Sequence, residues 1–333
     1  MSSTLPENQV LAVRDLSVRF YTYAGVVHAV SQAYLDVFER ETVALVGETG
    51  CGKSVFTKAI TGLIDPPGRI ETGQALFRKR DGTIVDLIKL SPEEIREIRG
   101  NEIAYIFQDP SSSLDPLYTA GDHIAETILE HRPITKDEAY REAVQLLRDV
   151  LIPNPEVRVK NYPHELSGGM RQRVVIATAI ANKPRLLIAD EPTTNLDVTV
   201  QAQILDLLRG LKEKYKMSLL LITHNLGVVA ETADRVYVMY GGRIAETADV
   251  NTIFEAPMHP YTQLLLRAVP NPLKRIERLE SIPGTVPNLI DMKPGCPFAP
   301  RCPFAMDICR KEDPPRIDLG NGHVVHCWLH AKR

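Results

Sequence analysis

The sequence predicts an α/β protein built around a parallel sheet, because strand-like and helix-like segments alternate along its second half. Short apolar runs at residues 186–189, 218–223 and 235–240 have the length and composition of buried strands, and residues 198–215 between two of them indicate a helix. A fourth apolar run, at residues 43–46, leads directly into a glycine and is also typical of a buried parallel strand.

The composition predicts an ordered chain of about two domains. Of its 333 residues, 44% are hydrophobic and 24% are charged, which excludes disorder as the dominant state. With 39 basic and 42 acidic residues the formal charge is -3, so no global field attracts nucleic acid and we expect no nucleic-acid partner. No apolar run approaches the roughly 18 residues of a spanning helix. Residues 1–10 lack the order of a signal peptide, so we expect a cytoplasmic chain with reduced thiols.

Other segments predict an antiparallel part and a helical subdomain. Residues 9–46 and 69–90 contain further strand-like segments rich in β-branched and aromatic side chains. Residues 115–165 have helical apolar spacing and contain no convincing strand. Capping boxes beginning at Ser91 and Thr135 mark two helix starts.

Residues 47–54 match the phosphate-binding pattern G-x-x-x-x-G-K-[ST]. Glycines in such a loop let backbone N–H groups point at phosphate oxygens, and the helix expected over residues 53–63 directs its positive end at the same anion. Lys53 is placed to reach the β- and γ-phosphates and Ser54 to ligate Mg²⁺, whereas Cys51 occupies a variable position. The predicted ATP-binding residues are Gly47, Glu48, Thr49, Gly50, Cys51, Gly52, Lys53, Ser54 and Val55.

Two carboxylates end the strand predicted over residues 186–189. A second parallel strand beside a phosphate loop is where nucleotide hydrolases keep a Mg²⁺-binding aspartate, and Asp190 suits that role. Glu191 then suits the general base that orients the attacking water.

A second anion-binding segment follows the helical region at residues 166–173. Ser167 can cap a helix that runs to about Asn182, and two glycines leave backbone groups bare at its N-terminus. Together with the phosphate loop and the two acids, this segment resembles the ATP-binding subunits of ABC transporters. Residues 166–170 are similar to the family's LSGGQ signature, with Met170 in place of Gln. The resemblance implies that the residues acting on a partner's ATP are Ser167, Gly168, Gly169 and Met170.

The same resemblance assigns further site residues. Gln108 matches the Q-loop glutamine that contacts Mg²⁺ and the attacking water, and Asp197 belongs to a segment similar to the D-loop. His224 matches the switch histidine that contacts the γ-phosphate, although Asn225 replaces the usual neighbouring Asp. Tyr23 is the candidate aromatic for stacking on adenine, with Tyr21 as its rival.

The resemblance covers essentially the whole chain and implies its domain organisation. We expect an ABC ATPase domain with a P-loop NTPase core over residues 1–245, including a helical subdomain over about 107–168, and a loop-rich C-terminal extension over 246–333. In this family ATP lies between the phosphate loop of one subunit and the signature of another. An active site therefore requires a second, homologous ATPase subunit.

Four C-terminal segments indicate which group within the family the chain resembles. Residues 259–262, 282–284, 295–298 and 301–302 are similar to the oligopeptide/dipeptide/nickel group of importer ATPases. This implies a heterodimer of ATPase subunits at the cytoplasmic face of the membrane, two integral membrane permeases and an extracellular solute-binding protein. The expected cargo is a di- or oligopeptide, with an oligosaccharide or nickel as alternatives. A soluble ABC ATPase without a transport role is disfavoured, because the chain has one phosphate loop and no heptad run.

Four of the five cysteines lie near the C-terminus with the spacing C-x5-C-x6-C-x17-C. Four thiolates suit Zn²⁺ or an iron–sulfur cluster, and no pair has the two-to-four-residue separation that structural zinc sites prefer. The resemblance implies a four-iron four-sulfur cluster; zinc, with nearby histidines as further ligands, and unligated thiols remain alternatives. We expect loss of the cluster to unfold the chain from about residue 285 while leaving ATP binding at Lys53 intact. The candidate ligands are Cys296, Cys302, Cys309 and Cys327, with His323, His326 and His330 as the alternative zinc ligands.

Overall fold

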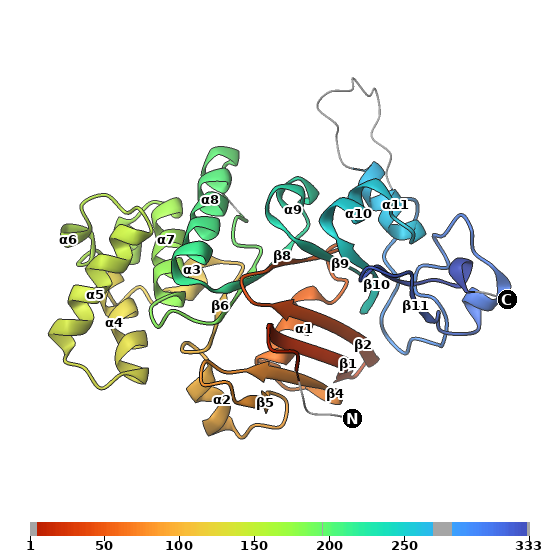
Figure 1. The fold of residues 1–333 in the computed structure, drawn as a ribbon, viewed down its shortest axis with the longest axis horizontal. Helices are drawn as coiled ribbons and strands as arrows, with labels where there is room; N and C mark the ends of the chain where they lie inside the picture. Colours follow the sequence, from red (N-terminus) through yellow and green to blue (C-terminus); the bar gives the residue numbers. More distant parts are fainter. Residues whose placement is uncertain (1–4, 195, 269–281, 332–333) are drawn as a thin grey trace.

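The computed structural model describes residues 5–194, 196–268 and 282–331, and its centre is a mixed eight-stranded sheet (Figure 1). The parallel strands are β3 (Thr42–Val46), β6 (Ile103–Ile106), β7 (Leu186–Asp190), β8 (Ser218–Thr223) and β9 (Arg235–Tyr240). The antiparallel strands are β10 (Arg243–Asp249), β11 (Arg316–Asp318) and β12 (Val324–His326). The sheet order is β11-β12-β10-β9-β3-β8-β7-β6. The predicted parallel sheet is confirmed, and β6 is a strand that the sequence patterns had not indicated.

A four-stranded antiparallel sheet packs beside this core and occupies the lower part of Figure 1. Its strands are β1 (Gln9–Thr22), β2 (Gly25–Phe38), β4 (Gly68–Arg78) and β5 (Ile84–Asp86), in the order β2-β1-β4-β5. Side chains from both sheets share one apolar cluster, which includes Leu16 and Val30 from the small sheet and Leu45 and Ile222 from the large one. The helix after the phosphate loop contributes Phe56 to the same cluster, so the two sheets and this helix form one packed unit.

Helices cover the large sheet and form a lobe at one end. Those of the core are α1 (Lys53–Ile60), α2 (Pro92–Ile98), α8 (Val198–Tyr215), α9 (Leu226–Thr232), α10 (Val250–Glu255) and α11 (Pro260–Arg267). Those of the lobe are α3 (Pro110–Ser113), α4 (Ala120–His131), α5 (Lys136–Asp149), α6 (Pro155–Arg158) and α7 (Gly168–Ala179). Single-turn 3₁₀ helices lie at Pro163–Glu165, Asp307–Arg310 and Trp328–His330. The capping boxes at Ser91 and Thr135 are confirmed, because each side chain accepts from the third helical N–H and the glutamate there returns the bond.

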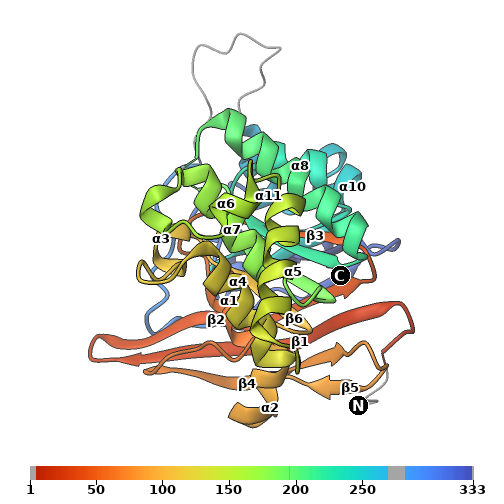
Figure 2. The same cartoon turned by 90° about the vertical axis from the view of Figure 1, so that its left-hand side faces the viewer.

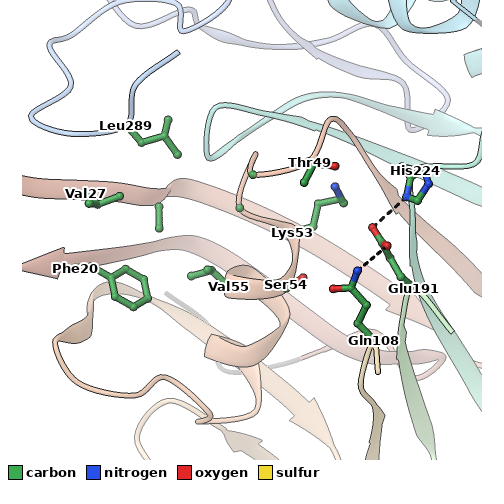
Figure 3. A pocket seen from close by; sticks show the side chains of 13 residues that line it. Phe20, Val27, Thr49, Lys53, Ser54, Val55, Gln108, Glu191, His224 and Leu289 are labelled. Atoms are coloured by element: carbon green, nitrogen blue, oxygen red, sulfur yellow. Dashed lines mark hydrogen bonds and ion pairs between the residues drawn. The ribbon is translucent and has the colours of Figure 1, made fainter. Parts of the chain in front are cut away.

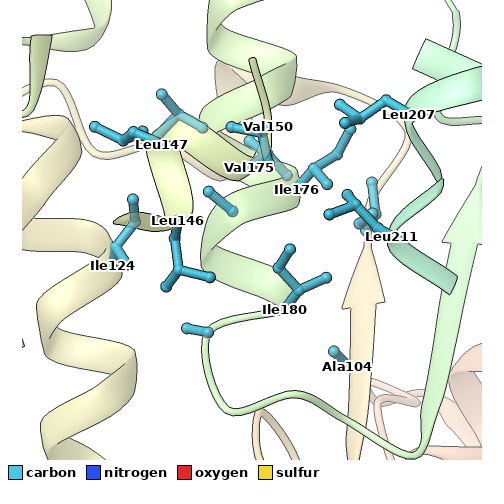
Figure 4. Packing of buried hydrophobic residues seen from close by; sticks show 14 of the residues in the cluster. Ala104, Ile124, Leu146, Leu147, Val150, Val175, Ile176, Ile180, Leu207 and Leu211 are labelled. Atoms are coloured by element: carbon cyan, nitrogen blue, oxygen red, sulfur yellow. The ribbon is translucent and has the colours of Figure 1, made fainter. Parts of the chain in front are cut away.

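The lobe is held to the sheet through α7. Figure 2 views the molecule from the helical end and shows the antiparallel sheet lying below these helices. Apolar side chains of α4 and α5 meet those of α7, and α7 in turn packs against α8 (Figure 4). Leu147 from α5 and Ile176 from α7 are fully buried in this cluster. A continuous apolar contact therefore joins the lobe to the strands, so the N-terminus of α7 is fixed relative to the sheet.

The C-terminal extension is built onto the large sheet. β12 pairs with β10 through Glu246 and Thr247. The boundary expected between residues 245 and 246 therefore lies inside β10. Phe298 packs against Tyr240 and Tyr261 in a third apolar cluster, with ring centroids 5.1 and 5.4 Å away. Within residues 5–194, 196–268 and 282–331, no helix is long and apolar enough to cross a membrane.

Candidate functional site

The phosphate loop lies between the end of β3 and the start of α1, as the sequence predicts. Gly47 and Gly52 have φ angles of 154° and 105°. A Cβ atom on Gly47 would lie 2.2 Å from the Met239 carbonyl oxygen, and one on Gly52 would lie 2.4 Å from the Ala29 carbonyl oxygen. Only glycine fits these two positions. Gly52 also caps α1 without a side-chain hydrogen bond, so the first N–H groups of this helix are free for an anion.

Lys53 is buried and folds back over the loop. Its Nζ donates to the carbonyl oxygens of Gly47 at 2.8 Å and Glu48 at 3.1 Å. These bonds hold the ammonium group inside the curve of the loop, next to the space where phosphate oxygens would lie. The positive charge of Lys53 therefore lies within the phosphate loop.

The carboxyl ends of neighbouring strands bring three other predicted residues together (Figure 3). Gln108 follows β6, Glu191 follows β7 and His224 follows β8, and these strands are adjacent in the sheet. Gln108 Nε2 donates to Glu191 Oε2 at 3.0 Å, and His224 Nδ1 lies 3.1 Å from Glu191 Oε1. The Thr194 hydroxyl donates to Glu191 Oε2 at 3.0 Å. Glu191 is thus at the centre of a polar network that fixes both of its oxygens.

Asp190 has a different environment from its neighbour. It is only 4% exposed, its Oδ2 accepts from the Tyr105 hydroxyl at 3.0 Å, and its Oδ1 is buried without a protein partner. Burial raises the pKa of this carboxyl above its usual range, and the neighbouring Ser54 and Tyr105 hydroxyls partly oppose the shift. A buried carboxylate oxygen without a hydrogen-bond donor fits a divalent cation, so Asp190, Ser54 and Gln108 are suitable ligands for Mg²⁺.

Most predicted nucleotide contacts line one cavity of about 390 Å³. Glu48, Cys51 and Gly47 are not among its lining side chains. The Glu48 carboxylate points instead to the C-terminal extension, and burial raises the pKa of the Cys51 thiol. The lining residues are Phe20, Val27, Ala29, Thr49, Gly50, Gly52, Lys53, Ser54, Val55, Gln108, Glu191, His224 and Leu289.

The end of the cavity away from Glu191 differs from the sequence prediction. Tyr23 lies at the exposed turn between β1 and β2, outside the cavity, and the Tyr21 hydroxyl donates to Glu71 on the surface. The side chain that enters the cavity from β1 is Phe20, because successive residues of a strand face opposite sides. The placement of adenine on Tyr23 or Tyr21 is therefore not supported by the geometry.

The signature residues lie away from this cavity. Ser167 is exposed and caps α7, with its Oγ accepting from the Met170 N–H at 3.3 Å. Asp197 is also exposed and caps α8, with Oδ1 accepting from the Val200 N–H at 3.0 Å. Neither side chain lines the cavity that contains Lys53. Both capped helix N-termini therefore lie outside the chain's own nucleotide cavity.

The four C-terminal cysteines gather in the extension but do not form a ligand set. The Cys296 N–H donates to the Cys309 carbonyl oxygen at 2.8 Å, and Cys309 and Cys327 are buried. Burial, with smaller contributions from the neighbouring thiols, raises the pKa of Cys296 to about 12 and that of Cys327 to about 11. Within the described residues, no group of three or more His, Cys, Asp or Glu side chains is arranged to hold a metal ion. The donor chemistry suits a soft metal, but these positions do not assemble a metal centre.

The histidines of the extension have other partners. His323 Nε2 lies 2.8 Å from Glu246 Oε1, and His330 Nε2 lies 3.0 Å from the Met258 carbonyl oxygen. The His326 ring stacks on Tyr34 with centroids 5.5 Å apart. The geometry therefore does not support these histidines as zinc ligands.

Comparison with known protein families agrees with this geometry. Residues 30–194 match the ABC transporter family, and residues 245–309 match the oligopeptide/dipeptide transporter C-terminal region. The dipeptide transport ATP-binding protein DppD of Bacillus subtilis is 47% identical over 98% of this chain and 96% of its own length. The chain belongs to the ABC transporter ATP-binding proteins of the dipeptide/oligopeptide family.

Other relatives and solved structures are also similar to this chain. The DppD protein of Escherichia coli is 49% identical over 96% of each chain, and the oligopeptide transport ATP-binding protein OppD of Bacillus subtilis is 48% identical over 96% of this chain and 89% of its own. Among solved structures, the ATP-binding cassette MJ0796, described as a dimer bound to ADP and phosphate, has a TM-score of 0.63 and 25% identity. It covers 72% of this chain and 98% of its own. The protein is thus an ABC ATPase that hydrolyses ATP for transport.

The buried state of Asp190 predicts a pH-dependent gain in stability from Asp190→Asn when Mg²⁺ and nucleotide are absent. Burial raises the pKa of Asp190 in the folded protein above its ordinary value, so at neutral pH the protein bears the cost of a buried charge. Neutral Asn avoids this cost, and we expect it to stabilise the fold by about 1–3 kcal/mol at pH 7. As pH falls through the folded pKa, Asp190 becomes protonated and the gain disappears.

Urea denaturation at a series of pH values in EDTA measures this effect. The matched control is Asp307→Asn, which changes an exposed carboxylate of the extension and should leave stability unchanged at every pH. A gain for Asp190→Asn that is constant with pH, or absent at neutral pH, would contradict the interpretation.

Proposed function

We propose that this ATPase drives the import of di- or oligopeptides through partner permeases. The observation that carries the proposal is a cavity lined by the phosphate loop, Gln108, Glu191 and His224, in a chain whose extension matches the oligopeptide/dipeptide transporter C-terminal region. The names of the relatives add support, since DppD and OppD are described as dipeptide and oligopeptide transport proteins. Oligosaccharide and nickel uptake are alternative cargoes for the same motor, and a soluble role without transport is the least favoured alternative.

In the proposed reaction, these residues bind the triphosphate and activate the water that attacks it. The loop N–H groups and Lys53 bind the triphosphate. Ser54, Asp190 and Gln108 would hold Mg²⁺, which would supply positive charge to offset that of the phosphates. Glu191 accepts a proton from the attacking water, because its oxygens are fixed at the strand ends beside the phosphate loop. His224, which also lines the cavity, contacts the γ-phosphate in this proposal.

The signature residues act in this proposal on a second subunit's ATP. Ser167, Gly168, Gly169 and Met170 lie at an exposed helix N-terminus, and so does Asp197 on the next helix. A helix N-terminus stabilises an anion, and the chain's own triphosphate site lies elsewhere. We propose a homologous ATPase as the partner, giving a heterodimer at the cytoplasmic face of the membrane.

The general-base assignment predicts that Glu191→Gln keeps ATP binding and loses turnover. The amide preserves the shape and one hydrogen-bond acceptor but cannot take a proton, so we expect hydrolysis to fall about 100-fold or more. Phosphate release and nucleotide binding should be measured on the assembled complex. The control is Glu231→Gln, which changes an exposed carboxylate on α9 outside the cavity. Hydrolysis at a near wild-type rate by the Glu191→Gln complex would remove Glu191 from this role or assign the activity to the partner's site.

The transport assignment predicts co-purification and peptide-dependent activity. A tagged chain extracted in detergent should bring two integral membrane proteins and a related ATPase. In vesicles, the assembled complex should hydrolyse ATP faster when its solute-binding protein is loaded with peptide. Stimulation by an oligosaccharide or by Ni²⁺ instead would select one of the alternative cargoes, and a chain that associates with no membrane protein would overturn the transport role.

We further propose a four-iron four-sulfur cluster on Cys296, Cys302, Cys309 and Cys327, with Zn²⁺ as the alternative. Support comes from the donor set: four thiols gathered in one short segment in which Pro-rich loops replace most regular hydrogen bonding. Binding requires these loops to close around the metal, since the thiols do not form a ligand set as placed. Metal would then stabilise the extension directly.

The cluster predicts brown protein after anaerobic purification, with about four irons per chain in metal analysis. Cys302→Ser should lose the colour and lower the thermal midpoint of the extension, whereas Cys51→Ser, outside the cysteine group, should keep the iron content. Zinc in place of iron would support the alternative. A metal-free wild-type protein with an ordered C-terminus would exclude both.

A further inference from the structure

The C-terminal extension forms part of the wall of the nucleotide cavity. Leu289 lines the cavity together with Phe20 and Val27, at the end away from Glu191 and His224 (Figure 3). These are apolar side chains, whereas the other end contains Lys53 and Glu191. An apolar slot at this end fits the flat, weakly polar base of a nucleotide.

Leu289 is held in place by backbone pairing with β2. Its carbonyl oxygen accepts from the His28 N–H at 2.8 Å, and Ile290 forms an antiparallel bridge with Val27. The Asp291 N–H donates to the Val26 carbonyl oxygen at 2.8 Å, and Asp291 Oδ1 accepts from the Val26 N–H at 3.0 Å. Residues 289–291 thus extend the edge of the antiparallel sheet, which makes Leu289 a fixed wall.

A second contact joins the extension to the phosphate loop itself. Arg301 makes a two-pronged ion pair with Glu48, with NH1–Oε2 at 2.7 Å and NH2–Oε1 at 3.1 Å. The Arg301 side chain is 5% exposed and that of Glu48 is 25% exposed, so the pair is largely shielded from water. The Tyr240 ring packs against the guanidinium, and Tyr240 Oη accepts from NH1 at 3.1 Å. The hydrogen bonds to Glu48 raise the pKa of Arg301 above its usual range, so this cation is permanent.

The two contacts lie on one continuous segment that carries the first cysteines. Leu289 precedes Cys296 by seven residues, and Arg301 directly precedes Cys302. Arg301 also donates to the Pro283 and Ile282 carbonyl oxygens at 2.8 and 3.2 Å, which ties the start of this segment to its end. The segment therefore spans from the base end of the cavity to the phosphate loop.

We propose that residues 282–302 are a built-in part of the ATP site, in which Leu289 forms the wall of the base slot and Arg301 is a positioning residue for the phosphate loop through Glu48. This inference rests on the proposed ATP-binding role of the loop. Arg301 neutralises a carboxylate that belongs to the loop itself and turns it away from the cavity. Without Arg301, the negative charge of Glu48 is free to oppose the triphosphate.

The contacts of Leu289 and Arg301 can be tested separately, because the proposal assigns them to different parts of the nucleotide. A non-hydrolysable ATP analogue with Mg²⁺ has a base and a triphosphate, whereas Mg-tripolyphosphate has only the phosphates. Leu289→Ala should weaken the ATP analogue about fivefold through lost apolar contact and leave tripolyphosphate unchanged. Arg301→Ala should weaken both ligands, by about tenfold or more, because it leaves a shielded charge unpaired.

Calorimetric titration of the full chain measures these affinities, and a double variant tests the mechanism. If the harm from Arg301→Ala comes from the freed carboxylate, Glu48→Gln in the same chain should restore most of the affinity. Matched controls are Leu319→Ala and Arg310→Ala, which change exposed side chains of the same extension and should bind both ligands as the wild type does. If Arg301→Ala does not fold, Arg301→Lys, which keeps the charge but not the two-pronged geometry, should give an intermediate loss for both ligands.

Several outcomes would overturn the proposal. Wild-type affinity in both Leu289→Ala and Arg301→Ala contradicts it, and so does an equal loss for ATP analogue and tripolyphosphate in Leu289→Ala. A loss in Arg301→Ala that Glu48→Gln does not relieve assigns Arg301 a general structural role instead. Lys53→Ala distinguishes this failure from that of the underlying function: it should abolish binding of both ligands, and its failure to do so would remove the phosphate loop as the ATP site.

Discussion

The pairing of β3 between β8 and β9 is the constraint on which the site depends. All five residues of β3 are buried, and the strand is hydrogen-bonded in parallel register on both sides. This fixes the point where the chain leaves the sheet at Gly47 and begins α1 at Lys53. Since β6, β7 and β8 run in the same direction, their carboxyl ends bring Gln108, Glu191 and His224 to the same edge. The chemistry is therefore assembled by strand order, from residues far apart in the sequence.

Features that depend on local geometry could be predicted from the sequence. The phosphate loop, the two acids after β7 and the capped helix at Ser167 each combine a residue pattern with a short-range backbone requirement. Most strands before residue 241 also followed from composition, except β6. The antiparallel strands β10, β11 and β12 were not predicted, because they lie in or beside the segment whose prolines favoured loops. Short-range sequence patterns thus predicted both the fold class and the residues at the polar end of the cavity, which contains Lys53 and Glu191.

Features that depend on distant contacts could not be predicted in this way. Tyr23 was a reasonable aromatic candidate, but the twist and register of β1 place Phe20 at the cavity instead. Tyr105, which donates to the buried Asp190, lies 85 residues before it, and no spacing rule connects the two. Arg301 reaches Glu48 across 253 residues. Such pairs become visible only when the sheet and the extension are folded together.

The same contacts change how the cysteine-rich extension is understood. A Pro-rich segment after residue 246 suggested a separable unit whose unfolding would leave ATP binding intact. In the structure, the extension adds β12 to β10, places Leu289 against β2 and pairs Arg301 with the phosphate loop. This segment, which has few regular hydrogen bonds, forms part of the wall of the nucleotide cavity. If nucleotide binds in this cavity as proposed, the stability of the extension and the affinity for ATP are linked, because a ligand that binds only the folded site favours the folded extension.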